Sequence, residues 1–570
     1  MQHVPMSQAS IISELTRLAW TARYLKSGQI TAQVRRRVGS CLQREHANGQ
    51  AVAEFRGCLW PRDVRFLPPG AQDNRANGIR QGTLRFLNSE VTVGFPPRWD
   101  CQLPKLWQYN LHYFEWLWAL DYEDAKSVVL DWIERYLLAK SAVGWEPYPT
   151  SLRLINWTTV FWGRFREQVE GDHVFLEKLW SSIFRQVQWL ARHLETRLLG
   201  NHYFENGATL AFVGSCFKGE QPRRWFEKGH NILREQIPEQ VPPDGMHFEL
   251  SPMYHCRMIY VLAMLAATGN ERLKRLIAEP LGRMLKALDA VCHPDGGIAL
   301  LNDSALGICH EPDELRSFCS GLPGMAPLLP PMMPGCFALP DAGYYGWRDL
   351  KGNYVLCDFG RIGPDYIPGH AHADIFSFEL SLQGHRVIVD TGVHDYEVSQ
   401  TRRYCRSTAA HNTVEVNGQD QCQMWASFRV ARRGYPRDVQ WRPSRKGFSI
   451  SGWHDGYHRL PSRSAHHRSI EGHCENGLTV TDRITSSRVV KAVSRLHLHP
   501  TCTVVRMNEA GIEVEHPKGR VRITCPNGGI VRVEDGWYFP EFSLKERNKV
   551  VALENTGTDI ELCFHVQNVT

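Results

Sequence analysis

Apolar residues recur at helical spacing through the first 320 residues of the chain. Near the N-terminus, for example, Leu15, Leu18, Ala22 and Leu25 follow the three- and four-residue steps that place side chains on one helix face. Glycines and prolines interrupt the pattern, which predicts many helices with short connections, as in a bundle, solenoid or toroid. The expected helices span residues 10–42, 106–118, 122–140, 151–169, 173–197, 204–217, 221–236, 250–268, 271–277 and 279–292.

The pattern changes after about residue 345. Short runs of β-branched and aromatic residues, such as 354–357, 413–418 and 478–482, alternate with Gly, Asn and Asp and predict an antiparallel β domain. A proline-rich stretch precedes this region and is typical of a linker. The expected organisation is an N-terminal helix and irregular segment at 1–100, a helical domain at 101–320, a linker at 321–345 and an antiparallel β domain at 346–570.

The composition is that of a globular protein with more than one domain. The chain of 570 residues exceeds the size at which a single hydrophobic core stops growing, and 43% of it is apolar and 22% charged. A net charge of +6 is too small for a protein that coats nucleic acid, but it permits a basic groove for an anionic polymer. Aromatic residues make up 11% of the chain, which allows sugar-stacking platforms beside a core.

The cysteines and the first residues of the chain indicate in which cellular compartment the protein is expected. Sixteen cysteines are scattered without CxxC pairs or regular spacing, which argues against metal knuckles and a disulfide framework and favours a reducing compartment. The first ten residues lack a basic segment followed by an apolar run, so we expect no secretory signal. No apolar run is long enough to span a membrane. A cytoplasmic location is therefore expected, with a periplasmic or secreted one open if the start is misassigned.

The densest cluster of candidate chemistry is PGHAHADIFSFEL. His370 and His372 alternate with alanines at the entry to an expected strand, where residues two apart share a face. A glycine turn and a returning strand then bring Asp390 to a similar edge, and His411 opens another β-rich run. Two imidazoles and a carboxylate from different strands suit Zn²⁺ or Mn²⁺, although histidines that are merely satisfied within a sheet give the same pattern.

Two segments of the helical half also carry polar chemistry. In NHYFENG, His202 and Glu205 lie one turn apart on one face if Asn201 is near a helix start, a pattern that a capping pair also produces. In DGMHFELSPMYH, a turn leads into a helix that carries Tyr254 and Arg257 in its first turns, where a tyrosine is often part of a core. Neither segment alone decides a function.

Taken together, these motifs and their order resemble the heparinase II/III family of polysaccharide lyases. The resemblance rests on NHYFENG, DGMHFELSPMYH, PGHAHADIFSFEL, VDTGVHDYE and RSTAAHNTVEVNG, and WQYNLHYFEWL is similar to the family's opening helix. It spans about residues 100–420, and the later β-rich region fits by type only. The resemblance implies an N-terminal (α/α) incomplete toroid followed by a C-terminal antiparallel β-sandwich.

The resemblance further implies β-elimination across the C4–O bond of a uronic acid, which leaves a 4,5-unsaturated sugar. The implied partner is an anionic polysaccharide, such as heparan sulfate, hyaluronan or chondroitin sulfate. By position, Asn201 would neutralise the uronate carboxylate, Tyr254 would be the base or acid, and His202 and His370 would be its partner groups. The chemistry agrees, because a proton α to a carboxylate is acidic enough only when that charge is neutralised and a base and an acid lie within reach.

The resemblance also implies supporting residues. His372, Asp390 and His411 would hold one divalent ion, Zn²⁺ or Mn²⁺, with a structural role, and no organic cofactor is expected. A guanidinium can grip a sulfate or carboxylate through two hydrogen bonds. The candidate substrate-binding residues are Glu205, Arg153, Arg257 and Arg406.

Four alternatives stay open at this point. A uronyl C5-epimerase abstracts the same proton and returns it to the other face, and an alginate-type lyase differs only in its polymer. A glycan-binding protein without catalysis would keep the aromatic cleft but does not need Asn201, His202, Tyr254 and His370 together. A glycoside hydrolase would need two carboxylic acids flanking the bond, whereas the residues clustered here are mainly Asn, His and Tyr.

Overall fold

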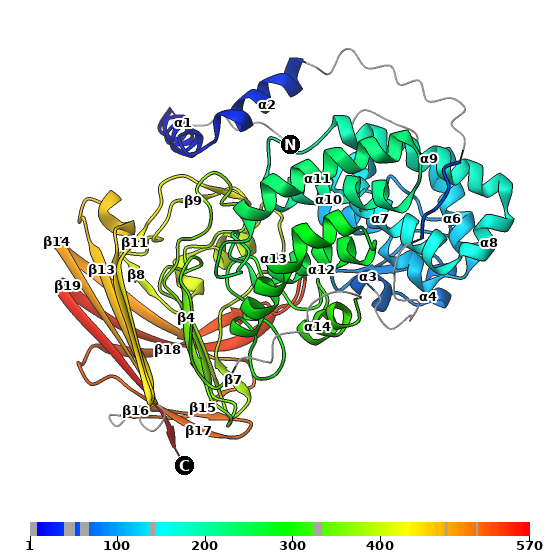
Figure 1. Ribbon diagram of the computed structural model, residues 1–570. Helices are drawn as coiled ribbons and strands as arrows, with labels where there is room; N and C mark the ends of the chain where they lie inside the picture. Colours follow the sequence, from blue (N-terminus) through cyan, green and yellow to red (C-terminus); the bar gives the residue numbers. More distant parts are fainter. Residues whose placement is uncertain are drawn as a thin grey trace.

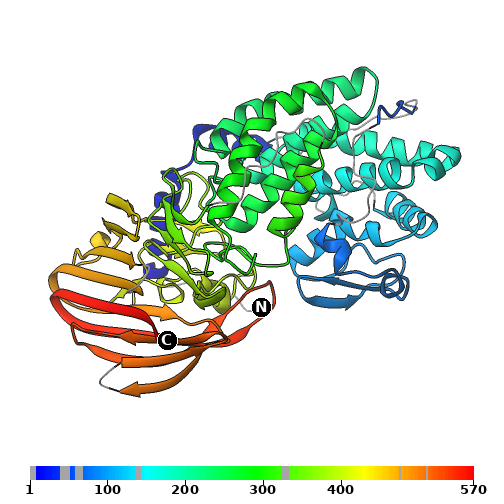
Figure 2. The same cartoon turned by 60° about the horizontal axis from the view of Figure 1, so that its bottom comes forward.

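The predicted order of helices first and antiparallel sheets second is confirmed. The computed structural model describes residues 8–38, 52–57, 68–136, 143–322, 333–473, 477–508 and 511–569. Figures 1 and 2 both show the helices from α3 to α14 on one side and the two large sheets on the other, and Figure 1 shows α1 and α2 over the β domain. No helix within these ranges is long and apolar enough to span a membrane.

The N-terminal segment contains two helices, α1 (Gln8–Ala22) and α2 (Ser27–Val38), where one helix was expected over 10–42. A turn follows the first helix. The second helix starts after Lys26, whose backbone amide donates a hydrogen bond of 3.0 Å to the Gln29 side chain. Two short helices and a hairpin follow, as expected for the irregular region: α3 (Pro69–Gln72), α4 (Ala76–Arg80), β1 (Thr83–Phe86) and β2 (Ser89–Thr92).

The helical domain follows the predicted series closely. Its helices are α5 (Lys105–Tyr113), α6 (Tyr122–Arg135), α7 (Pro147–Thr158), α8 (Arg166–Gly171), α9 (His173–Arg192), α10 (Gly200–Cys216), α11 (Glu220–Gln240), α12 (Pro252–Ala267), α13 (Glu271–Ala290) and α14 (Pro312–Ser320). The expected helix at 151–169 is divided by a π-helical turn at Thr159–Arg164. The two helices expected at 271–277 and 279–292 are one, α13, which continues through Pro280.

Side-chain caps explain why several helices begin where they do. Asp172 accepts a hydrogen bond from the Phe175 amide at the start of α9, and Asn270 accepts one from the Arg272 amide at the start of α13. Both caps satisfy amides that the helix itself leaves without partners. The central helix α10 is buried on almost all sides, and it packs so closely on α11 that a Cβ atom added at Gly229 would lie 2.4 Å from the Ala211 nitrogen.

The β domain contains two large sheets. One has the order β3-β4-β5-β6-β7: β3 (Gly335–Leu339), β4 (Tyr344–Arg348), β5 (Tyr354–Asp358), β6 (Phe378–Leu382) and β7 (His385–Ile388). The other has the order β11-β12-β13-β14-β19-β17-β16-β15, with β18 on β19 and β8 on β14. Its strands are β8 (Val414–Val416), β11 (Pro436–Ser444), β12 (Gly447–His454), β13 (Ala465–His473), β14 (Gly477–His497), β15 (Thr503–Asn508), β16 (Gly511–His516), β17 (Gly519–Thr524), β18 (Ile530–Tyr538) and β19 (Glu546–Val569).

The five-stranded sheet joins the two domains because its faces belong to different cores. Tyr354 and Leu356 point into the helical core, whereas Val355 and Cys357 point into the core of the β domain. The Tyr354 hydroxyl donates a hydrogen bond of 2.7 Å to the Ala290 carbonyl at the end of α13. Successive side chains of a strand point to opposite faces of the sheet, so this sheet packs against the helices on one face and against the β domain on the other.

Two local expectations fare differently. The hairpin turn predicted before Arg386 is present, with Gln383 and Gly384 both at positive φ. The strand expected at His370 and His372 is absent, because both histidines lie in an irregular loop and β6 begins only at Phe378. In the proline-rich stretch, residues 323–332 lie outside the described part of the chain, and β3 begins at 335, within the range expected to be linker.

Candidate active site

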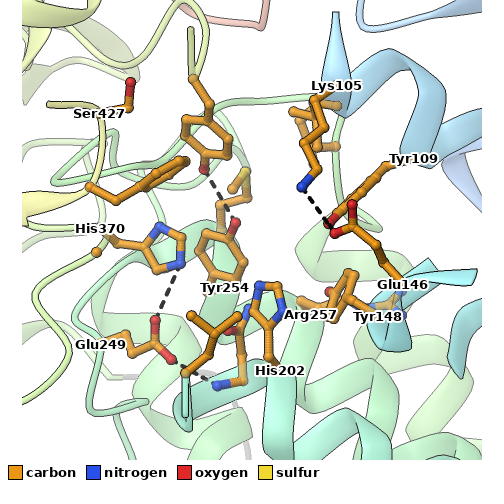
Figure 3. A pocket seen from close by; sticks show the side chains of 18 of the residues that line it. Lys105, Tyr109, Glu146, Tyr148, His202, Glu249, Tyr254, Arg257, His370 and Ser427 are labelled. Carbon is orange, nitrogen blue, oxygen red and sulfur yellow. Dashed lines mark hydrogen bonds and ion pairs between the residues drawn. The ribbon is translucent and has the colours of Figure 1, made fainter. Parts of the chain in front are cut away.

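A cleft of about 640 Å³ lies where the two domains meet. Helices α5, α10 and α12 supply one part of its wall, and loops of the β domain around residues 367–370, 396–398 and 426–429 supply the rest. Figure 3 shows His370, Tyr254 and His202 together, facing Lys105, Tyr109 and Glu146 across the cleft. All four predicted catalytic residues, Asn201, His202, Tyr254 and His370, line it.

The start of α10 places Asn201 at the cleft. Leu199 and Gly200 both have positive φ, and a Cβ atom at Gly200 would lie 2.5 Å from a Glu249 oxygen, so glycine is required there. The Asn201 amide nitrogen of the backbone donates to that Glu249 oxygen at 2.9 Å. The side-chain nitrogen, Nδ2, is buried and has no hydrogen-bond partner among the described residues. It is therefore available to donate a hydrogen bond into the cleft.

His202 projects into the cleft from the next position of α10. Its Nδ1 lies 3.0 Å from the Glu195 carboxylate, and its ring lies 4.4 Å from the ring of Tyr148. Burial lowers the pKa of His202, but nearby carboxylates, with Glu195 first, outweigh that effect and the net pKa is raised. The ring is therefore held in a fixed orientation and favours its protonated form.

Tyr254 occupies the first turn of α12, where the Ser251 hydroxyl caps its amide. Its ring packs on His370 with 3.9 Å between ring centres, and its hydroxyl lies 3.2 Å from that of Tyr396. Burial raises the pKa of Tyr254 above its ordinary value, in spite of the hydrogen bond to Tyr396. A phenolate at this position therefore needs neighbouring groups that stabilise it.

His370 lies between two buried carboxylates. Its Nδ1 is 3.1 Å from Oδ2 of Asp303, and its Nε2 is 3.2 Å from Oε2 of Glu249. The Nδ1 contact is a hydrogen bond to Asp303, whereas the Nε2 contact with Glu249 is a close approach without hydrogen-bond geometry. This arrangement fixes the orientation of the His370 ring beside Tyr254.

Of the predicted substrate-binding residues, Arg257 lines the cleft and Glu205 supports it from behind. Glu205 is fully buried and accepts two hydrogen bonds from Arg257, of 3.0 and 2.8 Å, and one of 2.7 Å from Tyr148. The prediction that Glu205 binds substrate directly is not matched by its position, because its oxygens are occupied by these partners. It fixes the direction in which the Arg257 guanidinium points.

The other two predicted arginines lie outside the cleft. Arg153 is fully buried behind it, donates to Gln186 and to the Gly144 carbonyl at 2.8 Å each, and lies 4.2 Å from the ring of Trp132. Arg406 is also buried and donates to the carbonyls of Ala371 and Ala426. Burial lowers the pKa of both arginines to about 9. Their hydrogen bonds serve the fold, and their position behind the cleft does not match the predicted role in substrate binding.

Several site residues were not predicted. Glu249 and Tyr396 lie within the quoted motifs, and that position was the only signal for them. On the facing wall, Lys105 lies 2.9 Å from Glu146, which also accepts a hydrogen bond from Tyr109. Asp303 lies outside every motif, and no local pattern identified it.

A second cluster of polar residues lies beneath the cleft. One ligand atom from each of His372, Asp374 and His411 falls within 4.8 Å of the others, and all three residues are fully buried. His372 bonds Asp303 through Nε2 at 2.9 Å, and His411 bonds Asp390 through Nδ1 at 2.7 Å. The other nitrogen of each ring and both oxygens of Asp374 have no hydrogen-bond partner among the described residues. These groups fit a divalent cation.

The cluster differs from the predicted ligand set in one residue. Asp390 was expected to be a ligand with His372 and His411, but its carboxylate accepts the His411 hydrogen bond and orients that ring. Asp374 provides the oxygens that face the two free nitrogens. Asp374 lies in PGHAHADIFSFEL and Asp390 in VDTGVHDYE, and only the folded backbone decides which of the two carboxylates faces the free ring nitrogens.

Comparison with known proteins identifies relatives of both domains. The model of the heparinase II/III N-terminus matches residues 109–312, and the model described as heparinase II/III-like, C-terminal, matches residues 331–568. A heparin-sulfate lyase of Pedobacter heparinus is 26% identical over 307 residues, which are 48% of this chain and 44% of that protein. One of Bacteroides thetaiotaomicron is 23% identical over 373 residues, which are 55% of this chain and 52% of that protein. The chain thus spans about half the length of these relatives.

Solved structures share the fold. A crystal structure of heparinase III superposes with a TM-score of 0.68 at 16% identity, over 84% of this chain and 80% of that one. The heparan sulfate lyase HepC from Pedobacter heparinus gives a TM-score of 0.57 at 18% identity, over 97% and 88% of the two chains.

Proposed function

Because this chain belongs to the heparinase II/III family, as its motifs predicted, we propose that it is a lyase that cleaves a uronate-containing polysaccharide by β-elimination. The observation that carries the proposal is the convergence of Asn201, His202, Tyr254 and His370 on one cleft. The proposed substrate is a glycosaminoglycan of the heparan sulfate kind, because the relatives at 23% and 26% identity are heparin-sulfate lyases.

The first requirement of the reaction is to neutralise the uronate carboxylate. The unpartnered Nδ2 of Asn201 donates a hydrogen bond to it, and the Arg257 guanidinium, held by Glu205, adds positive charge on the same wall. Donors that are fixed before substrate binds stabilise the developing aci-carboxylate without reorganisation. The C5 proton becomes acidic enough for a protein base to remove it.

The second requirement is proton transfer at C5 and at the leaving oxygen. The base takes the C5 proton, the released electron pair forms the C4–C5 double bond, the C4–O bond breaks, and the leaving oxygen accepts a proton. Tyr254 can serve either end, with His202 and His370 as the partner groups. The hydrogen bond with Tyr396 favours the phenolate form of Tyr254, and the His370 ring lies 3.9 Å from the Tyr254 ring, centre to centre, as a neighbouring group for proton transfer.

We also propose that His372, Asp374 and His411 hold one divalent ion, Zn²⁺ or Mn²⁺, with a structural role. Such an ion would supply positive charge, and its ligands would link the irregular loop of residues 369–377 to the segment just before β8. The pairing of each histidine with a carboxylate supports this proposal, since metal-bound imidazoles commonly donate their other N–H to a carboxylate.

The deciding experiment is continuous ultraviolet absorbance of the unsaturated uronate, recorded with heparan sulfate, hyaluronan, chondroitin sulfates and alginate. A rise with heparan sulfate supports the proposal, and a rise with another polymer alone replaces the proposed substrate. A flat trace across the panel, accompanied by deuterium uptake at C5, would identify an epimerase instead.

A further inference from the structure

A short turn between α13 and α14, Asn302-Asp303-Ser304, contacts the main parts of the site. Asn302, at φ 56°, accepts a hydrogen bond from the His372 amide at 3.0 Å and donates one to the Leu250 carbonyl at 3.1 Å. The Ser304 hydroxyl lies 2.9 Å from that of Ser251, the cap of α12. The turn therefore connects the helix that carries Tyr254 with the loop that carries both histidines.

The carboxylate of Asp303 lies at the centre of this turn and is shared by two imidazoles. Its Oδ2 is 3.1 Å from Nδ1 of His370, which lines the cleft, and its Oδ1 is 2.9 Å from Nε2 of His372, in the metal cluster. The Arg402 guanidinium donates to both oxygens and balances the charge. Asp303, His372 and Arg402 are all buried.

We propose that Asp303 is a positioning residue that couples the metal cluster to the acid–base group His370. This inference rests on the proposed function and on the proposed metal site. Each Asp303 oxygen is hydrogen bonded to one nitrogen of a different ring, which fixes both ring orientations at once: Nε2 of His370 is turned toward Glu249 at the cleft wall, and Nδ1 of His372 is turned toward Asp374 and His411. Neither ring can rotate without breaking a bond to the same carboxylate.

The shared carboxylate has a consequence for the metal. If His372 held a cation at Nδ1, its ring would be restrained, and the shared Asp303 carboxylate would restrain His370 in turn. The metal cluster then influences turnover without touching the substrate. Conversely, loss of the Asp303 carboxylate should weaken metal binding and misplace His370 together, whereas a residue that only supports the fold would not link the two effects.

The test compares Asp303→Asn with a matched control, Asp482→Asn. Asp482 is equally buried, accepts two hydrogen bonds from Arg468, at 2.6 and 2.7 Å, and lies 2.7 Å from Nε2 of His466, but it lies in the core of the β domain and does not line the cleft. Both substitutions should lower thermal stability. Only Asp303→Asn should reduce zinc affinity, by about 10–100-fold, and kcat by a similar factor, with KM nearly unchanged.

A double-mutant cycle with His372→Ala separates coupling from general damage. If Asp303 transmits the effect of the cluster, the double variant should lose little more kcat than the worse single variant, whereas His372→Ala and Asp482→Asn should be additive. Should Asp303→Asn not fold, Asp303→Glu keeps the charge beside Arg402 but cannot meet both rings in the same geometry. It should give the same non-additivity with a smaller loss of zinc affinity.

The outcomes are distinguishable. Additive losses in the Asp303 cycle, or equal losses of zinc affinity in Asp303→Asn and Asp482→Asn, would overturn the inference. If the wild-type protein cleaves no polysaccharide of the panel, the proposed function fails, and zinc titration of the same variants still decides whether Asp303 organises the cluster.

Discussion

Replacing Tyr254 by phenylalanine removes one oxygen atom from the cleft and keeps the ring that packs on His370. The hydroxyl makes one hydrogen bond, 3.2 Å to Tyr396. Tyr254→Phe should therefore lower the free energy of unfolding by only about 1–3 kcal/mol, the cost of leaving one buried polar group without its partner.

The expected effect on catalysis is larger than this effect on stability. Loss of a general acid or base typically costs a factor of about 10²–10⁴ in rate. At about 1.4 kcal/mol per factor of ten, that is about 3–6 kcal/mol in activation free energy. KM should change little, because Asn201 and Arg257 remain on the cleft wall.

The assay is absorbance of the unsaturated product under saturating substrate, combined with thermal melts of each variant. Tyr396→Phe is the matched control, since it removes the other hydroxyl of the same hydrogen bond and leaves Tyr254 in place. It should lose no more than about tenfold in kcat, the equivalent of one hydrogen bond. Near wild-type turnover by Tyr254→Phe, or equal losses in the two variants, would refute the assignment of Tyr254 as the proton-transfer group.

Three further predictions concern residues around the cleft. Arg153→Met should lower the free energy of unfolding by about 2–4 kcal/mol, because buried acceptors lose their donor, and an altered KM would contradict its position outside the cleft. Glu205→Gln should raise KM by about tenfold, because Arg257 loses its charged, bidentate partner, and an unchanged KM would rule out this role. The pKa of His202 is raised in the fold, chiefly by Glu195, so their interaction stabilises the protein fully below the unfolded-state pKa of about 6.5 and is lost as the pH rises through the folded-state value. The difference in urea stability between wild type and His202→Gln should therefore be greater at about pH 5.5 than at about pH 8.5, and a reversed order would contradict the sign.

The sequence by itself determined the features that depend on near neighbours. Helical periodicity located the helices, including buried α10 and α12, and the Gln383-Gly384 turn set the hairpin between β6 and β7. The motifs identified Asn201, His202, Tyr254 and His370, all of which line the cleft. These features can be predicted from the sequence because they depend on side chains a few residues apart in the same helix or turn.

Tertiary structure alone decided which charged groups meet. Asp303 is 67 residues from His370 and 99 from Arg402, so no spacing rule joins them. Arg153 and Arg257 both lie on helices of the same domain, yet one is enclosed by Trp132 and backbone carbonyls while the other reaches the cleft. A guanidinium carries the same charge in either place. Its role follows from which partners surround it after the helices pack, and that packing is fixed by contacts across the whole chain.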